Sequence, residues 1–363
     1  MDGALSHCIE KVRAASAAAT PLRLRGGGTK DFYGEPAVGE VLDTTGLSGI
    51  RSYEPSELVV TVGAGTTLAE LEAVLADKGQ CLPFEPPRFG AGGTVGGMVG
   101  AGLSGPARAS AGSVRDFVLG LSMVNGRGEL LTFGGQVMKN VAGYDVSRLM
   151  AGALGTLGLI AEVSLKVLPQ APAEATLKFS MSQRDALQRL NAWGGQPLPL
   201  NASRWLQEPG GAALYVRLRG AQAAVEAACR SMGGERQDEA AAQAAWTACR
   251  DQQLPWFTER TGRDLWRLSV PQTAPELDLP ESPLVEWHGA QRWIAADAGD
   301  AGHLRRVAAQ AGGHATLFRA SPNGARTQRM HPLASPLDRI HRELKRQFDP
   351  AGIFNRGRLY PEL

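Results

Sequence analysis

Two glycine-rich segments constrain this chain more than any other feature of its sequence. The first, Gly26–Thr29, follows the short apolar run Leu22–Leu24, and the second runs from Gly90 to Gly105. Successive glycines reach positive φ values that a Cβ disfavours, so consecutive N–H groups can converge on one phosphate oxygen. A single cluster of this kind is usually a flexible turn. Two clusters, each after a strand-like segment, favour two halves of one anion-binding cradle and predict a pyrophosphate ligand.

Length and charge exclude several classes of protein. The chain has 363 residues, 43% of them hydrophobic, which is enough for two or three packed domains. The net charge of +2 provides no polybasic face, so we expect no nucleic acid partner and at most peripheral contact with a membrane. Apolar runs shorter than a bilayer span and an N-terminus without signal-peptide features predict a cytoplasmic protein.

The four cysteines argue against a metal centre in this chain. They are Cys8, Cys81, Cys229 and Cys249, and no two of them form a C-x-x-C pair. Their spacing predicts neither an iron–sulfur cluster nor a structural zinc site, so no metal is expected here. Any such metal would belong to another chain.

Local patterns predict the elements around the two glycine clusters. We expect a helix over residues 3–19, a strand over 58–62, a helix that Thr67 caps and that ends near 78, a hairpin of 117–124 with 129–133, and a strand over 159–168. Asn125-Gly126 is the turn signal of the hairpin. The stretch from Gly79 to Phe117 is rich in glycine and proline and weakly periodic, which predicts a long functional loop.

One motif in that stretch requires caution. Gly100–Gly105 matches the dinucleotide fingerprint G-x-G-x-x-G, which would suggest a Rossmann domain. The fingerprint needs a strand before it and a helix opening from it, and the sequence predicts neither here. We therefore expect no nicotinamide cofactor.

These segments resemble a known flavoprotein family. Residues 20–170 are similar to the FAD-binding domain of the vanillyl-alcohol oxidase or PCMH type, in the order Arg25–Thr29, Leu58–Lys78, Pro86–Gly97 and Gly152–Ile160. Three further segments resemble the smaller FAD-binding subunit of bacterial glycolate oxidases, namely Lys139–Leu149, Gly312–Arg319 and Phe348–Arg358. That second resemblance spans nearly the whole chain.

The resemblance implies an α+β fold in three parts. Residues 1–170 would form the two-lobed PCMH-type FAD-binding domain and residues 171–345 a smaller α+β cap that binds substrate or a partner. Residues 346–363 would form a tail that returns to the flavin. Tryptophan is confined to the cap, between Trp193 and Trp293, where the seven side chains would form a core or, in part, a partner surface.

The resemblance also implies the residues that hold FAD. The pyrophosphate would bind the amides of Gly26, Gly27, Gly28 and Thr29, with backbone contacts from Thr94, Gly96 and Gly97 of the second cluster, and Gly155, Gly158 and Ile160 would line the ribityl or adenosine side. Pro86 would lie beside the cofactor, and Arg25 would be either a phosphate neighbour or a solvated surface arginine. Neither loop contains histidine, so FAD would be held noncovalently.

Reduction of a flavin places negative charge at its N1/C2 edge, so a cation there favours hydride acceptance. In the resembled family the tail supplies it, which makes Arg358 the candidate, with Asn355 as a neighbour. Where relatives have Asn-Pro-Gly, this chain has Asn355-Arg356-Gly357. That departure puts the course of the tail in question.

Oxidation of a 2-hydroxy acid further needs a base for the hydroxyl proton and a cation for the carboxylate. His314 and Arg319 are the catalytic candidates, although an odd spacing along one strand would place them on opposite faces. The His-Gly-His element that the resemblance implies for a catalytic subunit does not occur.

Two functions therefore stay open. In one, FAD on this chain takes the hydride from glycolate or a similar small 2-hydroxy acid. In the other, the chain carries a flavin for assembly and electron relay. Both imply a complex with a larger FAD-linked oxidase subunit and an iron–sulfur subunit, cytoplasmic or peripheral at the inner face of the membrane.

Overall fold

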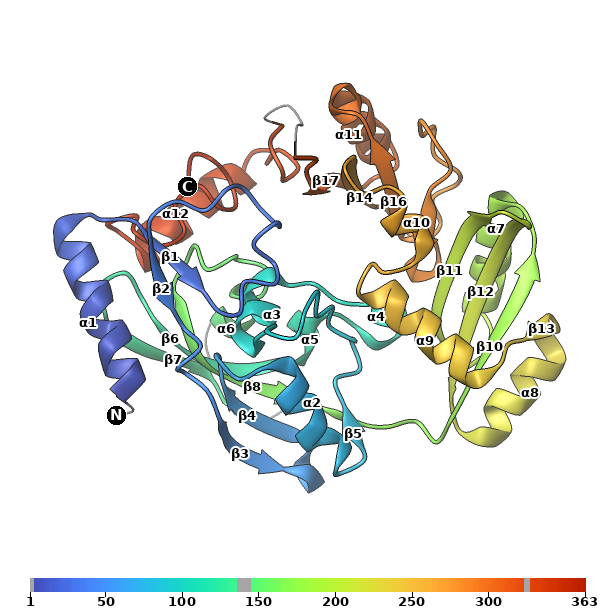
Figure 1. Ribbon diagram of the computed structural model, residues 1–363, viewed down its shortest axis with the longest axis horizontal. Helices are drawn as coiled ribbons and strands as arrows, with labels where there is room; N and C mark the ends of the chain where they lie inside the picture. The colour runs from blue at the N-terminus through green and yellow to red at the C-terminus, as the bar shows by residue number, and fades with distance from the viewer. Residues whose placement is uncertain (1–2, 136–144, 323–326) are drawn as a thin grey trace. The chain divides into compact units, whose positions relative to one another are not determined.

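The computed structural model describes residues 3–135, 145–322 and 327–363, and its contacts divide the chain into two compact units (Figure 1). Unit 1 comprises Met1–Leu103, Ser113–Pro169 and Pro332–Leu363, and unit 2 comprises Ser104–Gly112 and Gln170–His331. Each unit mixes helices with a β-sheet, so the predicted α+β class is confirmed.

The division differs from the sequence-based boundaries in two places. Residues 332–345 belong with unit 1 rather than with the cap, because Leu344 and Phe348 of the helix Leu337–Phe348 pack on the core of unit 1. The short segment Ser104–Gly112 belongs to unit 2, although it lies within the predicted FAD-binding domain.

Unit 1 is built on a five-stranded antiparallel sheet in the order β3-β4-β8-β6-β7. A parallel pair β1-β2 and an antiparallel pair β5-β9 complete its strands. The strands are β1 (Leu22–Arg25), β2 (Glu40–Asp43), β3 (Ile50–Glu54), β4 (Val59–Gly63), β5 (Gln80–Cys81), β6 (Val118–Val124), β7 (Leu130–Gly134), β8 (Leu159–Lys166) and β9 (Leu168–Pro169). The helices are α1 (Gly3–Ala18), α2 (Leu68–Ala76), α3 (Val95–Ala101), α5 (Val114–Phe117), α6 (Val146–Leu149) and α12 (Leu337–Phe348).

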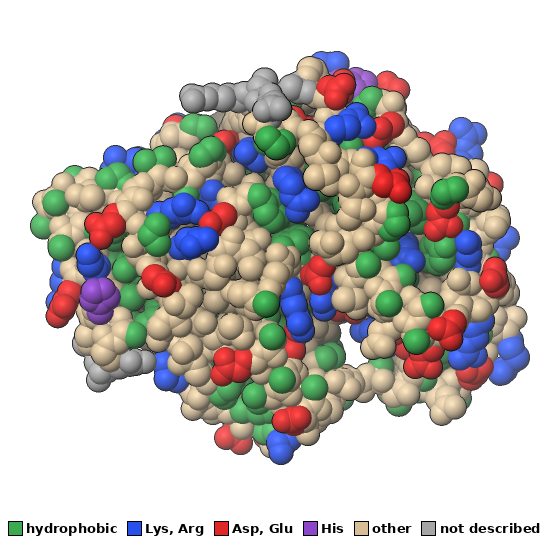
Figure 2. All heavy atoms as spheres, viewed as in Figure 1, with side chains coloured by type: hydrophobic (Ala, Val, Ile, Leu, Met, Phe, Trp, Pro, Cys, Tyr) green, Lys and Arg blue, Asp and Glu red, His purple; other side chains and the backbone are tan. Residues whose placement is uncertain are grey.

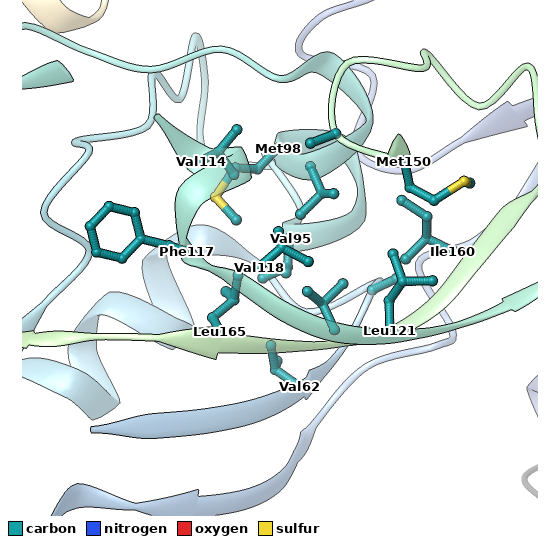
Figure 3. Close-up of a cluster of buried hydrophobic side chains, with 14 of the residues drawn as sticks. Val62, Val95, Met98, Val114, Phe117, Val118, Leu121, Met150, Ile160 and Leu165 are labelled. Carbon is teal, nitrogen blue, oxygen red and sulfur yellow. The ribbon is translucent and has the colours of Figure 1, made fainter. Parts of the chain in front are cut away.

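The core of unit 1 lies between this sheet and α3, the helix within the second glycine cluster (Figure 3). Val62 and Leu165 come from neighbouring strands, and Leu121 comes from the next strand along. Val95 and Met98 of α3 join the same cluster and are at most 1% exposed. Burial of α3 against the sheet therefore fixes the glycine-rich segment that precedes it.

Several predicted elements of unit 1 are confirmed. Helix α1 buries Cys8, Ile9 and Val12 in a cluster that includes side chains of β1 and β2. The Thr67 side chain accepts a hydrogen bond from the Glu70 amide at 3.1 Å and so begins α2.

The prediction of an irregular loop from Gly79 to Phe117 is wrong for its middle part. Residues Val95–Ala101 form α3, whose first turn is capped by the Thr94 hydroxyl. Gly100 lies in its last turn and Gly102 ends it with φ +65°. The G-x-G-x-x-G match therefore marks the end of a helix, whereas the dinucleotide fingerprint opens one.

The hairpin of β6 and β7 is confirmed, although Gly126 of the Asn125-Gly126 signal does not carry the positive φ of the turn. The Asn125 amide donates to the Glu129 carbonyl, and the positive φ falls on Gly128. Gly126 has another role, because its N–H donates to the carbonyl of Phe348 at 2.8 Å. The turn is thus adapted to the C-terminal end of α12.

Substitution of Gly126 tests this contact. A Cβ at Gly126 would lie 2.8 Å from the Cα of Asp349, which is backbone and cannot rotate away. We expect Gly126→Ala to lower the free energy of unfolding by about 1–3 kcal/mol, as overpacking does. Thermal unfolding checks this, with Gly135→Ala as control because a Cβ there meets nothing within 4 Å. Equal unfolding temperatures for the two variants would contradict the expected clash.

Unit 2 contains an eight-stranded antiparallel sheet in the order β13-β10-β12-β11-β15-β16-β14-β17. The strands are β10 (Ala173–Ser180), β11 (Leu200–Glu208), β12 (Gly211–Gly220), β13 (Glu235–Arg236), β14 (Asp264–Ser269), β15 (Leu284–Glu286), β16 (Gln291–Ala296) and β17 (His314–Arg319). The helices are α4 (Arg108–Ala111), α7 (Gln183–Gly194), α8 (Gln222–Met232), α9 (Glu239–Arg250), α10 (Pro255–Thr258) and α11 (Ala301–Gln310). Each half of the sheet has its strands in the order fourth, first, third, second, and the halves join where β11 pairs with β15.

The tryptophans belong to the interior of unit 2, so the core interpretation is confirmed. All seven are at most 7% exposed, namely Trp193, Trp205, Trp246, Trp256, Trp266, Trp287 and Trp293. They leave no exposed tryptophan surface for a partner.

Trp287 and the residue after it also hold the segment Ser104–Gly112. The Trp287 indole donates to the Gly105 carbonyl at 2.9 Å, and the His288 ring lies 2.9 Å from the Ser110 hydroxyl. Burial lowers the pKa of His288 to about 4, so the ring is neutral near pH 7.

Charged side chains of both signs are interspersed on the face of the molecule in Figure 2, in keeping with the small net charge. No helix in the described part of the chain is long and apolar enough to cross a bilayer.

Candidate functional site

A cavity in unit 1 is lined by residues from both glycine clusters and from the C-terminal tail. The space in it that protein atoms do not fill is about 810 Å³, which includes the solvent at its open side. The predicted residues that line it are Arg25, Gly26, Gly27, Gly28, Thr29, Thr94, Gly96, Gly97, Gly155, Gly158, Ile160 and Arg358. Pro86 is buried elsewhere and does not line this cavity, so its predicted place beside the ligand is not met.

The first glycine cluster offers unused hydrogen-bond donors. It begins where β1 ends. The carbonyl of Arg25, the last residue of β1, accepts a hydrogen bond from the Thr44 amide at 2.9 Å. Among the described residues, the N–H groups of Gly26–Thr29 donate to no protein acceptor. Consecutive free amides at the wall of a cavity are a feature of anion-binding loops.

The two glycine clusters are in direct contact. A Cβ at Gly27 would lie 1.5 Å from the carbonyl oxygen of Gly92, and a Cβ at Gly26 would lie 2.4 Å from the Thr94 hydroxyl. Gly28 has φ +71°, a left-handed conformation that glycine adopts most readily. A side chain at Gly27 would push the clusters apart, because backbone approaches backbone there.

The second cluster contributes space rather than donors. The Gly96 amide donates to the Ala64 carbonyl at 2.7 Å, and the Gly97 amide donates to the Thr94 hydroxyl at 3.2 Å. These N–H groups are therefore occupied, and the predicted amide contacts from Gly96 and Gly97 do not fit this pattern. The reason is that the segment is the capped first turn of α3, whose amides the protein itself satisfies.

Arg25 lines the cavity, and its side chain is 43% exposed. Its Nε donates to the Asp31 carboxylate at 2.9 Å, and Arg23 reaches the same carboxylate at 2.6 Å. The charged residues that line the cavity are Arg25, Lys30, Arg358 and Asp31, so positive charge exceeds negative charge. That surplus suits an anionic ligand.

The tail runs beside β1 and makes an isolated parallel bridge to it between Phe354 and Leu22. The Leu22 amide donates to the Ile353 carbonyl at 2.7 Å, and the Asn355 amide donates to the Leu22 carbonyl at 2.9 Å. The Asn355 side chain accepts from the Leu24 amide at 2.8 Å and donates to the Leu154 carbonyl at 2.6 Å. The course of the tail, which Asn355-Arg356-Gly357 had put in question, therefore runs beside β1.

Arg358 lies on the inner side of the same tail. It is 7% exposed, and its guanidinium donates to the carbonyls of Asp31 at 2.9 Å, Lys30 at 3.4 Å and Glu35. These carbonyls belong to the loop that follows the first glycine cluster. Arg358 therefore combines a positive charge at the cavity wall with a fixed position for that loop.

The remaining predicted wall lies between the tail and β8. Gly155 has φ +71°, and a Cβ there would lie 2.7 Å from the Asn355 amide nitrogen. Ile160, near the start of β8, is 8% exposed. Sequence reasoning missed the lining residues Asp31, Thr44 and Leu154. Only the adjacency of Asp31 and Leu154 to the glycine segments pointed to them.

The two catalytic candidates lie in unit 2 and do not line the cavity. His314 and Arg319 are the ends of β17, and a β-bulge near Phe318 changes their predicted relation. His314 pairs with Ser269 and Arg319 with Leu265, so both side chains lie on one face, contrary to the expectation of opposite faces. The odd spacing in the sequence predicted opposite faces because it took no account of the extra residue that the bulge adds to β17.

The surroundings of these two side chains disfavour extra positive charge. Desolvation lowers the pKa of His314, and the positive charges of Arg267 and His331 lower it further. Burial also lowers the pKa of Arg319, whose guanidinium donates to the Gln252 side chain at 3.1 Å. A neutral His314 near pH 7 could accept a proton.

Of the segment Lys139–Leu149, residues 139–144 lie outside the described residues. Asp145 accepts from the Arg148 amide at 3.1 Å and begins α6. In the ranges that the structure describes, no three His, Cys, Asp or Glu side chains are placed to hold a metal ion.

Comparison with known proteins gives consistent results. Residues 5–134 match the model of the FAD binding domain family. The chain is 46% identical to the glycolate oxidase subunit GlcE of Escherichia coli over 98% of this chain and 97% of that protein. It is also 31% identical to the glycolate oxidase subunit GlcD of Bacillus subtilis, over 46% of this chain and 36% of that protein.

The fold is shared more widely than the sequence. A solved structure of alkyldihydroxyacetonephosphate synthase superposes with a TM-score of 0.66 over 96% of this chain and 75% of that chain. The two are 15% identical, so this likeness speaks for the fold alone. It agrees with the predicted α+β fold class.

Proposed function

This chain belongs to the family of FAD-binding glycolate oxidase subunits, and we propose from that premise that it is the FAD-carrying subunit of a complex that oxidises glycolate or a similar 2-hydroxy acid. The observation that carries the proposal is the row of unused amides at Gly26–Thr29 on a cavity with surplus positive charge. These residues fit a pyrophosphate.

We assign a role in FAD binding to each part of the cavity wall. The first glycine cluster would hold the pyrophosphate, Gly155 and Ile160 would flank the extended part of the cofactor, and Arg358 would set positive charge beside the flavin. The contacts are all noncovalent. Bound FAD would supply the acceptor for the hydride that leaves the substrate carbon.

The chemistry at the substrate needs two further groups. A base must take the hydroxyl proton and a cation must hold the carboxylate, for which His314 and Arg319 are the candidates on β17. They face the same side of the sheet, with Thr316 between them. Electrons would then leave through partner subunits.

A second candidate function is electron relay, with substrate oxidised on a larger homologous FAD subunit and electrons passed to an iron–sulfur subunit. It is favoured by the cavity lining, which consists of unit 1 residues and includes no histidine. Two relatives of this chain bear the names of different glycolate oxidase subunits, which supports a multi-subunit complex. A cytoplasmic location, peripheral to the membrane at most, remains a prediction.

Anaerobic addition of glycolate tests both candidates. We expect the flavin absorbance of the chain co-expressed with its partners to bleach rapidly, and that of the purified chain alone to bleach much more slowly. Removal of this chain should abolish the activity of the complex. Turnover by the chain alone at the rate of the complex would contradict the dependence on partners and make His314 and Arg319 the catalytic residues.

A further inference from the structure

A buried ammonium group in α12 connects three segments of unit 1. Lys345 is 7% exposed, and its Nζ donates to the Asp349 carboxylate at 2.7 Å, the Thr156 carbonyl at 2.8 Å and the Phe354 carbonyl at 2.8 Å. An ammonium has three N–H donors, so every one of them is used. Lys345 itself does not line the cavity.

Two of these acceptors lie next to residues that line the cavity. Thr156 directly follows Gly155, which lines the cavity, and Phe354 directly precedes Asn355, which also lines it. The Asn355 side chain joins the same two segments again, through the Leu154 carbonyl. Lys345 and Asn355 therefore both link the Gly152–Gly158 loop to the tail. Lys345 does so outside the cavity lining, whereas Asn355 is itself part of that lining.

The carboxylate partner fixes the tail independently. Asp349 is 1% exposed and accepts from the amides of Ile353 at 3.1 Å and Phe354 at 2.8 Å. Held in this way, the Ile353 carbonyl accepts the hydrogen bond from the Leu22 amide. This contact aligns the tail with β1, and so with the first glycine cluster that follows β1. Burial lowers the pKa of Lys345, but the neighbouring Asp349 opposes that shift and favours the charged pair.

We propose that Lys345 is a positioning residue for the FAD pocket, which holds the Gly152–Gly158 loop and the C-terminal tail at the separation that the cofactor needs. A charged pair with every donor and acceptor satisfied is rigid, and loss of one partner leaves the other charge buried and uncompensated. The inference rests on the proposed binding of FAD in this cavity. It goes further by assigning a function to a residue that cannot touch the ligand.

The test compares FAD binding with stability in the full-length chain. In Lys345→Met/Asp349→Asn both charges are removed together, so no charge is left uncompensated. We expect this variant to fold, as judged by circular dichroism, and its dissociation constant for FAD to rise about tenfold or more. Its flavin absorbance band should also lose fine structure, since the pocket walls become less ordered. The single variant Lys345→Arg should bind FAD more tightly than the double variant but less tightly than the unmodified chain. The reason is that a guanidinium cannot place its donors as an ammonium does.

The matched control is Arg346→Met. Arg346 is the next residue of α12, with a side chain that is 67% exposed and paired with Glu343 on the surface. It should bind FAD as the unmodified chain does. A folded double variant with a dissociation constant within about twofold of the unmodified chain would overturn the inference.

Two further comparisons make every outcome decisive. If Gly27→Val loses FAD while the Lys345 variant retains it, only the role of Lys345 fails, whereas retention by both overturns the placement of FAD in this cavity. If the Lys345 variants do not fold, hydrogen exchange in the unmodified chain decides. Amides of residues 154–156 and 353–355 should become protected together when FAD binds, and independent protection would refute the coupling.

Discussion

A chain with valine at Gly27 should retain no FAD after gel filtration, while its circular dichroism stays that of a folded protein. The added Cβ would lie 1.5 Å from the Gly92 carbonyl oxygen, which must move and so separate the two glycine clusters. Because the amides of Gly26–Thr29 are unused by the protein, their displacement removes the donors for the pyrophosphate. We expect the affinity for FAD to fall by about a hundredfold or more.

Gly92→Ala is the matched control for this contact. It adds a Cβ to the second partner in the contact between Gly27 and Gly92. The atom nearest to this Cβ would be the Gly27 carbonyl oxygen at 3.4 Å, an ordinary van der Waals distance. That variant should keep its FAD. Wild-type FAD content in a folded Gly27→Val chain would contradict the role of the first glycine cluster.

Arg358→Met should weaken FAD binding by about tenfold to a hundredfold, since each hydrogen bond to a charged group contributes about 1.5–3 kcal/mol. The guanidinium holds the loop after the first glycine cluster through the carbonyls of Lys30, Asp31 and Glu35. Its loss would release that loop and remove a positive charge from the cavity wall. Titration of the apo-protein with FAD, followed by flavin fluorescence, measures the effect.

Arg356→Met controls for the general loss of an arginine from the tail. Arg356 is exposed, and its Nε donates to the Gly352 carbonyl at 2.9 Å, away from the cavity lining. Its substitution should leave FAD affinity unchanged. If both variants bind FAD equally well, Arg358 has no role in the pocket.

Local signals were sufficient where one segment determines its own structure. The Thr67 cap and the apolar stripe of residues 3–19 predicted their helices. The glycines of α3 hid a helix, because low helix propensity was outweighed by burial of Val95 and Met98 against the sheet. Propensity is a weak guide where tertiary packing supplies the stabilisation.

Features that depend on distant residues were beyond sequence reasoning. The occupied amides of Gly96 and Gly97 follow from acceptors on Ala64 and Thr94, and the shared face of His314 and Arg319 follows from a bulge in the pairing with β14. Neither is encoded in the segment concerned. Lys345 was overlooked for the same reason, since a lysine in a basic helix gives no sign that its partners are Thr156 and Phe354.

The contacts between the tail and β1 have a consequence for biosynthesis. Leu24 and Asn355, which share a hydrogen bond, are 331 positions apart in the chain. A ribosome-bound intermediate that already contains the matched residues 5–134 still lacks Asn355 and Arg358, which line the cavity. We therefore expect FAD to be loaded only after the C-terminal residues have emerged from the ribosome.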